Sequence, residues 1–461
     1  MNMQAVLRPA VLYIECTPTI RLDHGAGIAR VVRNIVQHAV RNGRDRGIDV
    51  RPIAFSNGNF FEARLTAEGK LVTRTESDRQ ARWRRRAKVC FRATVHLTGR
   101  ILPAGRARQW WMAPGADPGL TMTLRDNLRW FRTSAAELLN SVAIVSDAVQ
   151  FAQGDTVLAA EPLLDRNYVA AFLALRDKGV KLACVVHDLA PIRFPHQVPA
   201  RFRVNFRRWV DGNLAGSDLV VAISSTVRDD LADYFTGLAS AARPAGRRLA
   251  WFHLGQDLDR ALPDGKVRAA LARIFDDRDS GTVFLMVGWL HPRKNHTFVL
   301  DALERLHREG ISARLVLIGR RDLAADGFYR RVGAHADLAR QVFVFHDATD
   351  TELAYCYRRS SALVYPSISE GFGLPLVEAL GYGLRVFASD IPVFREIGEG
   401  YVSFFPLDDP EVLTGKLRRF CMDGHFDARR PIAEFRWPTW RESIERLLDI
   451  VLEPDGASDT A

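Results

Sequence analysis

The sequence predicts an α/β protein made of two domains, each built on a sheet of parallel strands. Short apolar runs of about four to eight residues alternate with amphipathic stretches of helical spacing, which is typical of buried strands in β-α-β units. The alternation is interrupted between Gly255 and Gly281 by a charged stretch punctuated with proline and glycine. A length of 461 residues also exceeds what one ordinary core accommodates.

The expected strands follow in order along both halves of the chain. In the first half they are the runs AVLYIEC, VRPIAF, DTVLAA, KLACVVHD, DLVVAIS and RLAWFHLG. In the second half they are TVFLMVG, ARLVLIG, QVFVFHD, SALVYPS and RVFAS. We therefore assign residues 1–262 to an N-terminal domain and 263–430 to a C-terminal domain. Residues 431–461 are expected to form a helix that packs back on the N-terminal domain, followed by a frayed tail.

The stretch of about 60–119 breaks the alternation, so we interpret it as an insertion in the first domain. It contains a basic stretch from Arg74 to Arg108, and the whole chain has a formal net charge of +10. Cations and apolar side chains alternate there: Arg82, Arg84, Arg85, Arg86 and Lys88 with Trp83, Val89 and Phe91. Such a segment fits an anionic membrane surface, a solvated face or a nucleic acid. We expect no nucleic-acid partner, because no recognisable nucleic-acid motif accompanies it.

The expected compartment is the cytoplasm, with peripheral contact at the inner face of the plasma membrane as one interpretation of the basic stretch. The N-terminal residues are interpreted as a first buried strand and not as a signal peptide. No apolar run approaches the roughly 18 residues that a spanning helix needs. The cysteines are widely scattered, and no two of them form a C-x-x-C pair: Cys16, Cys90, Cys184, Cys356 and Cys421. This spacing predicts neither a disulfide framework nor a zinc site.

A glycine-bearing loop within SISEGFGLPLVEALGYGLRVF is the most informative segment. It joins an apolar strand to a helix with Pro375 near its first turn. Gly371 and Gly373 would let the backbone approach a ligand closely, and the free amides around Phe372 to Leu374 would point outward. Helix N-termini of this kind bind phosphates, so the loop predicts an anion site.

Two carboxylates accompany this loop. Glu370 precedes the helix, and Glu378 lies about one turn past Pro375. Two carboxylates at one ligand would have different roles. The alternative is a solvated pair, because acidic residues near a helix start are favourable in any case.

A second cleft segment, VGWLHPRKNH, follows the strand TVFLM. Gly288 ends that strand, and Arg293 and Lys294 are expected to open the next helix. The fork of Arg and the compact charge of Lys together suit a diphosphate. A solvated pair of cations is the alternative interpretation.

The first half carries weaker signals. Gly25 and Gly27 form a turn after the first strand, where α/β folds bind ligands, although a simple tight turn explains them equally well. His187 and Asp188 end the strand KLACVVHD. An ordinary capping Asp beside a surface His is the alternative there.

Read in order, these segments resemble the retaining glycosyltransferase family 4, the glycosyl transferases of group 1. The resemblance rests on G-x-G-x-A-R, VVHDLAPIRFP, VAISSTVRDDL, FHLGQD, VGWLHPRKNH, LVLIGR, GLRVFASDIPVFREI and the pair Glu370 and Glu378 with seven residues between them. It is specific from Thr282 to Pro406 and patchy before that. It implies the GT-B fold, in which two Rossmann-like domains face each other across a cleft.

The resemblance also implies roles for individual residues. Arg293 and Lys294 would hold the diphosphate of a nucleotide sugar, and Glu378 would hold the ribose hydroxyls. Glu370, with the backbone from Gly371 to Leu374, would hold the sugar, and His187 would lie near it from across the cleft. Gly27 and Gly288 would complete the donor site. Trp289 lies where many relatives carry an Arg, so the phosphate site would depend more on Arg293.

The implied activity is transfer of a hexose, with a mannose-like or deoxyhexose sugar favoured, from a GDP- or UDP-linked donor. The acceptor would be a glycan or a lipid-linked saccharide, in bacterial surface polysaccharide synthesis. No metal or further cofactor is expected, because cations and helix amides can stabilise the leaving diphosphate. The alternatives are an epimerase or phosphorylase on the same fold, or an interaction protein without catalysis.

Overall fold

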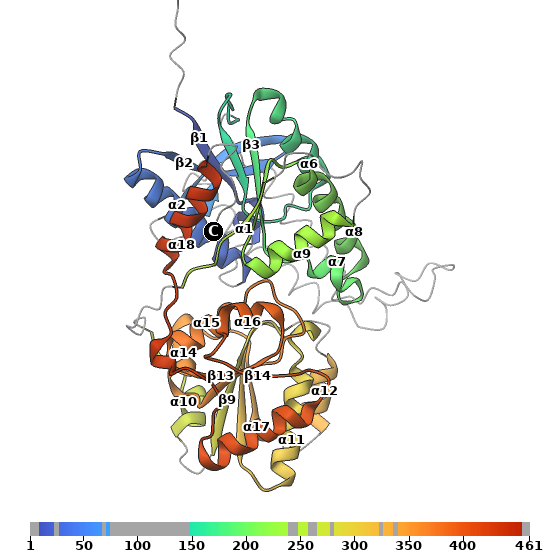
Figure 1. Ribbon diagram of the computed structural model, residues 1–461, viewed down its shortest axis with the longest axis vertical. Coiled ribbons are helices and arrows are strands. Elements are labelled where there is room, and N and C mark those ends of the chain that lie inside the picture. Colours follow the sequence, from blue (N-terminus) through green and yellow to red (C-terminus); the bar gives the residue numbers. More distant parts are fainter. Residues whose placement is uncertain are drawn as a thin grey trace, which may run out of the picture.

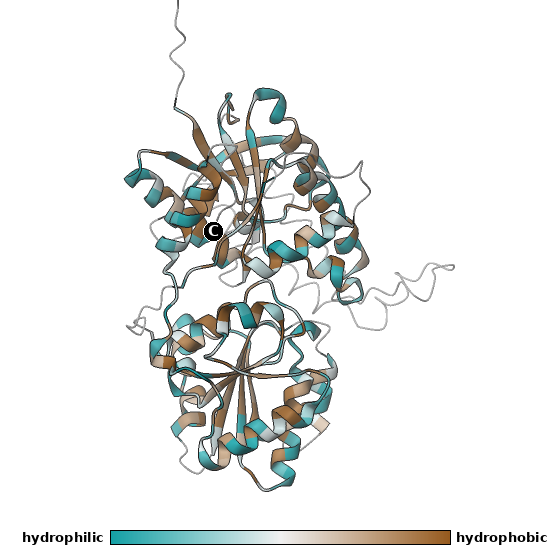
Figure 2. Cartoon of the chain, in the orientation of Figure 1, coloured by the Kyte–Doolittle hydropathy of each residue, from teal (hydrophilic) through white to brown (hydrophobic). Residues whose placement is uncertain are grey.

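The computed structural model describes residues 9–22, 27–66, 71–73, 148–237, 248–256, 265–276, 281–321, 326–334 and 340–453. It contains two α/β domains, one above the other in Figure 1. In each domain the strands are the apolar centre and polar residues gather on the outer faces of the helices (Figure 2). The basic cluster from Arg82 to Lys88 lies outside the described residues.

The N-terminal sheet has the strand order β4-β3-β2-β1-β5-β6-β7-β8. Its strands are β1 (Val11–Glu15), β2 (Asp49–Ser56), β3 (Asn59–Leu65), β4 (Leu71–Thr73), β5 (Thr156–Ala159), β6 (Lys181–Val186), β7 (Leu219–Ala222) and β8 (Arg248–Trp251). Strand β3 pairs antiparallel with both β2 and β4 at one edge, and the other neighbours are parallel. The described start of the expected insertion is therefore part of the sheet.

Helices cover this sheet and bring their first turns to its carboxyl edge. They are α1 (Thr17–Leu22), α2 (Ile28–Asp45), α6 (Arg166–Leu173), α7 (Ala190–Arg193), α8 (Ala200–Trp209) and α9 (Ser225–Thr236). Helix α2 buries one face, with Val31, Val32, Ile35 and Val36 at helical spacing. Helix α9 begins at a cap in which the Ser224 hydroxyl accepts from the Val227 amide at 3.1 Å.

The C-terminal sheet is parallel, with the strand order β11-β10-β9-β12-β13-β14. Its strands are β9 (Thr282–Val287), β10 (Ala313–Ile318), β11 (Val342–Phe345), β12 (Ala362–Tyr365), β13 (Arg385–Ser389) and β14 (Ser403–Phe405). Its helices include α10 (Ala269–Asp276), α11 (His296–Arg308), α12 (Asp326–Ala334), α14 (Asp350–Arg359), α15 (Leu374–Gly381), α16 (Pro392–Gly398) and α17 (Pro410–Asp423). Two parallel-sheet α/β domains confirm the predicted fold class.

The chain crosses between the domains twice, and the two crossings touch. The Gln256 amide donates to the Pro438 carbonyl at 3.0 Å, and the Trp437 indole donates to the Leu254 carbonyl at 2.8 Å. A Cβ on Gly255 would lie 2.4 Å from the Trp440 Cα, so only glycine fits there. After the second crossing, α18 (Trp440–Leu452) packs beside α2 (Figure 1).

The residues before α18 still lie on the C-terminal domain. The Arg430 amide donates to the Gly400 carbonyl at 2.8 Å, and the Tyr401 and Phe435 rings meet edge to face. Among the described helices, none is both long and apolar enough to cross a membrane.

Candidate active site

The glycine-bearing loop runs from β12 to α15 at the carboxyl edge of the C-terminal sheet, and there it touches the N-terminal domain. A Cβ on Gly371 would lie 1.7 Å from the His187 carbonyl oxygen, across the domain boundary. Gly373 has a φ of 120°, and a Cβ there would lie 2.8 Å from the Phe394 ring. Both glycines are therefore required by contacts within the protein, Gly371 by the His187 backbone and Gly373 by its φ and the Phe394 ring, while close approach of a ligand stays a prediction. Below, residues 367–374 are called the donor loop, after their predicted role.

Glu370 is the centre of a buried charge cluster in this loop. Lys294 Nζ binds Glu370 Oε1, and Arg293 Nη1 lies 3.5 Å from Oε2. The Tyr365 hydroxyl donates to Oε1 at 3.2 Å. The Glu370 side chain is 8% exposed. Burial by itself would raise the pKa of Glu370, but the two adjacent cations outweigh burial and lower it to about 2, so the carboxylate stays ionised.

The paired cations lie in a short 3₁₀ turn, Pro292–Lys294, and do not open helix α11 as expected. His291 caps this turn by accepting from the Arg293 amide at 3.2 Å, and Asn295 adopts a left-handed conformation with φ of 52° before the helix starts. Gly288 leaves room for the Lys294 side chain, whose Cε would lie 3.4 Å from a Cβ at that position. Burial lowers the pKa of Lys294, and Arg293 adds to this effect.

Glu378 on α15 has its own partners, separate from those of Glu370. Its Oε2 accepts from the Tyr357 hydroxyl at 2.8 Å, and its Oε1 lies 2.6 Å from Arg30 Nη1. Arg30 belongs to the first turn of α2, which starts after Gly27 in a left-handed conformation with φ of 65°. The ion pair thus brings the first turn of α2, which follows Gly27, against Glu378 across the domain boundary, while Gly25 lies outside the described residues.

His187 lies at the cleft through its backbone, while its ring turns into its own domain. Its carbonyl faces Gly371, and its Nε2 donates to the Ala160 carbonyl at 2.9 Å. Burial lowers the pKa of His187, which favours the neutral ring. The neighbouring Asp188 does reach the cluster, with Oδ2 3.7 Å from Arg293 Nη1.

Several contributing side chains were not assigned roles from the sequence. Arg30, Tyr357 and Tyr365 complete the surroundings of the two carboxylates. Arg30 stands inside the G-x-G-x-A-R segment, so the pattern contained it without showing its partner. In the described part of the chain, no group of three or more His, Cys, Asp or Glu residues is arranged to hold a metal ion.

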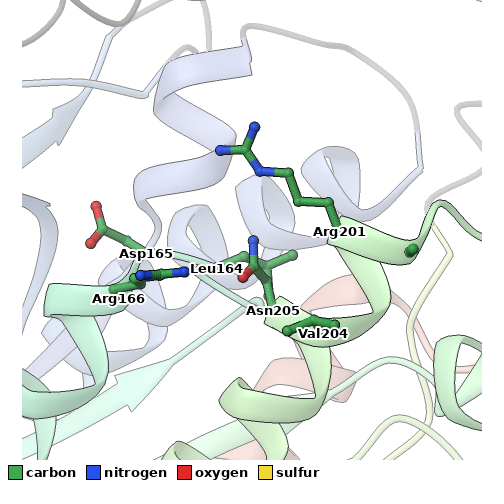
Figure 3. Close-up of a pocket in the computed structure, with 7 residues that line it drawn as sticks. Leu164, Asp165, Arg166, Arg201, Val204 and Asn205 are labelled. Carbon is green, nitrogen blue, oxygen red and sulfur yellow. The ribbon is translucent and has the colours of Figure 1, made fainter. Parts of the chain in front are cut away.

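A pocket of the N-terminal domain lies apart from this cluster. The side chains around it come from the start of α6 and the start of α8 (Figure 3): Leu164, Asp165, Arg166, Ala200, Arg201, Val204 and Asn205. None of the residues predicted for the donor lines it. The Glu370 cluster is the candidate active site, because buried opposite charges meet there at the carboxyl edges of two sheets.

The sequence of this chain is similar to the sequences of known glycosyltransferases. Residues 268–434 match the family described as glycosyl transferases group 1. The chain is 29% identical over 305 residues to the serotype-specific mannosyltransferase WbdA of Escherichia coli, covering 66% of this chain and 37% of that protein. It is 34% identical over 121 residues to the O-antigen chain mannosyltransferase RfbU of Salmonella typhimurium, covering 26% of this chain and 33% of the relative.

Among solved structures, the sucrose-phosphate synthase of Thermosynechococcus elongatus has a TM-score of 0.56 at 15% identity, covering 96% of this chain and 97% of that one. This likeness concerns the fold, and it confirms the predicted two-domain architecture. The family match confirms the resemblance drawn from the motifs. The chain spans little more than a third of the length of the mannosyltransferase WbdA that it matches.

Proposed function

We propose that this chain, a member of the glycosyl transferases group 1 family, is a retaining hexosyltransferase that uses a nucleotide-diphosphate sugar. The observation that carries the proposal is the buried cluster in which Arg293 and Lys294 share the carboxylate of Glu370 beside the donor loop. Two cations beside the loop that leads into α15 suit a diphosphate, and an ionised carboxylate suits the hydroxyls of a sugar.

In this proposal the cations supply the electrostatic part of catalysis. Charge develops on the leaving diphosphate, and Arg293, Lys294 and the amides of the donor loop would stabilise it in a site with little water. Front-face attack would retain the anomeric configuration, with the leaving phosphate assisting deprotonation of the acceptor. Glu370 is held by both cations, so it would orient the sugar as a hydrogen-bond acceptor.

For the donor we propose a GDP- or UDP-linked hexose, with mannose favoured. The mannosyltransferase names of the relatives support this choice. For the acceptor we propose a glycan or lipid-linked saccharide of bacterial surface polysaccharide synthesis. The pocket of the N-terminal domain offers Arg166 and Arg201 beside Asn205, groups that can bind a phosphate and sugar hydroxyls (Figure 3).

The test is a screen of GDP- and UDP-sugars for hydrolysis and for transfer to saccharide acceptors. We expect one donor to be consumed, with transfer when an acceptor is present, and we expect Glu370→Gln to abolish both. Arg308→Ala, an exposed change at the far end of α11, serves as a control. Conversion of the donor to its epimer without an acceptor would support an epimerase, and phosphorolysis would support a phosphorylase. If no donor binds, an interaction protein without catalysis is favoured.

We also propose that the N-terminal domain contacts an anionic membrane. Besides the basic stretch, α8 supports this, since Phe202 and Val204 are 42% and 55% exposed and alternate with Arg201 and Arg203. Vesicle co-sedimentation tests it, comparing wild type with a variant in which the five cations Arg82, Arg84, Arg85, Arg86 and Lys88 become Gln. We expect salt-sensitive pelleting of wild type on anionic lipid alone; equal pelleting of both proteins, or none, would contradict the proposal.

A further inference from the structure

The carboxylate of Glu396 on α16 crosses the domain boundary and binds four donors of the N-terminal domain. Oε1 accepts from the Ser225 amide at 2.7 Å and from His253 Nε2 at 2.7 Å. Oε2 accepts from the Thr226 amide at 2.8 Å and from its hydroxyl at 2.6 Å. In Figure 1, α9 lies on the side of the N-terminal domain that faces α15 and α16.

These four contacts saturate the carboxylate. Two of the donors are free amides in the first turn of α9, where a negative charge is favourable. The Glu396 side chain is 12% exposed. Burial would raise the pKa of Glu396, but the hydrogen bonds from His253 and Thr226 lower it to about 2, so the group is an anion at neutral pH.

Both elements that Glu396 contacts, the first turn of α9 and His253, also contact the donor loop. Ser224, the cap of α9, donates from its hydroxyl to the Gly371 carbonyl at 2.8 Å. The His253 ring packs against Phe372, with centroids 5.9 Å apart, and against Trp437 at 4.9 Å. Phe372 and Trp437 meet edge to face at 5.8 Å. One carboxylate thus fixes both elements of the N-terminal domain that support the loop.

We propose that Glu396 is a positioning residue for donor binding, which acts through the start of α9 and through His253 to seat the donor loop against the N-terminal domain. The role in donor binding rests on the proposed function. It explains why a residue outside the charge cluster has an anionic, fully hydrogen-bonded side chain at a domain boundary. If the proposal holds, weakening the contacts of Glu396 should change the amide exchange of the donor loop and the affinity for nucleotide, and not only the stability of the fold.

The main test is Glu396→Gln, which keeps the size of the side chain but places an NH₂ group against donors. We expect affinity for GDP or UDP, measured by calorimetry, to fall by about tenfold. We expect faster amide hydrogen exchange in the donor loop and in the first turn of α9. Arg395→Gln is the matched control, because it removes an exposed ion pair with Asp390 from the same helix. Its affinity and exchange should equal those of wild type.

A double-mutant cycle separates positioning from a general structural role. Ser224→Ala removes the contact with Gly371, so its effect on nucleotide affinity should not add to that of Glu396→Gln. If Glu396→Gln does not fold, Thr226→Val removes one hydroxyl donor and serves in its place. Unchanged affinity and loop exchange in a folded variant, or full additivity in the cycle, would overturn the proposal. If wild type binds no nucleotide, the proposed function fails, and loop exchange still decides the role of Glu396.

Discussion

Arg30 of the N-terminal domain lies 2.6 Å from Oε1 of Glu378 in the C-terminal domain, and this ion pair joins the two sides of the cleft. The Glu378 side chain is 7% exposed, whereas that of Arg30 is 40% exposed. Tyr357 donates to the other oxygen of the carboxylate. Removal of Arg30 would therefore leave a nearly buried charge with one neutral partner.

We predict that Arg30→Ala lowers the free energy of unfolding by about 1–2 kcal/mol, a value reduced from that of a fully buried pair because the guanidinium is partly solvated. Arg41→Ala, an exposed change on the same helix, should stay within about 0.5 kcal/mol of wild type. Urea unfolding measures both. An Arg30 variant as stable as the Arg41 variant would show that the pair contributes nothing.

Arg293→Ala and Lys294→Ala should each weaken nucleotide-sugar binding by roughly 1.5–3 kcal/mol, since each removes a charge-assisted contact with the diphosphate. Calorimetry with the donor found in the screen is the measurement. Unchanged affinity in both variants would refute the diphosphate assignment.

Turnover should persist in excess EDTA, because side chains and amides would stabilise the leaving group without a metal ion. The rate with and without chelator is compared at constant pH and ionic strength. Loss of activity that Mg²⁺ or Mn²⁺ restores would contradict this prediction.

Gly371→Ala should reduce both stability, by about 1–3 kcal/mol, and donor affinity, because the new Cβ would lie 1.7 Å from the His187 carbonyl oxygen. The backbone of the donor loop or of the His187 segment must shift to relieve this contact. Gly327→Ala is the control, since nothing lies within 4 Å of a Cβ at that helical position. Thermal unfolding and calorimetry should distinguish the two variants.

Glu15 gives a prediction about pH. Burial raises its pKa from 4.5 to about 7, against a hydrogen bond from the Thr17 amide at 2.8 Å. The native state therefore binds more protons than the unfolded state between about pH 4.5 and 7, so this group lowers stability as pH rises through that window. The loss above pH 7 is on the order of 3 kcal/mol.

Glu15→Gln removes this titration and should stabilise the protein more at pH 8 than at pH 5. The difference between variant and wild type is the quantity to measure, because the lowered pKa values of His187 and His296 affect both proteins equally. A stability difference that does not change with pH would show that Glu15 does not titrate in this window.

Much of the fold could be predicted because parallel strands leave a local pattern. Each expected apolar run coincides with a strand of the structure. Strands β3, β4 and β14 were missed. β4 and β14 are edge strands of three residues, and β3 lies next to an edge and is partly exposed, so none of them has a long continuous apolar run. The 3₁₀ turn before α11 was also missed, because the left-handed Asn295 that ends it leaves no clear mark in the sequence.

The sequence by itself determined the two sheets, the glycines of the donor loop and the chemical types available at the cleft, because periodicity and backbone freedom are properties of neighbouring residues. Only the tertiary structure decided which charges meet. Lys294 and Glu370 are 76 positions apart, and Arg30 and Glu378 are 348 apart. The first pair depends on how segments of the C-terminal domain pack, and the second on how the two domains pack against each other. Arg30 and Glu396 therefore had partners that no local pattern could reveal, and the ring of His187 turns into its own domain and not toward the place that the resemblance had assigned to it.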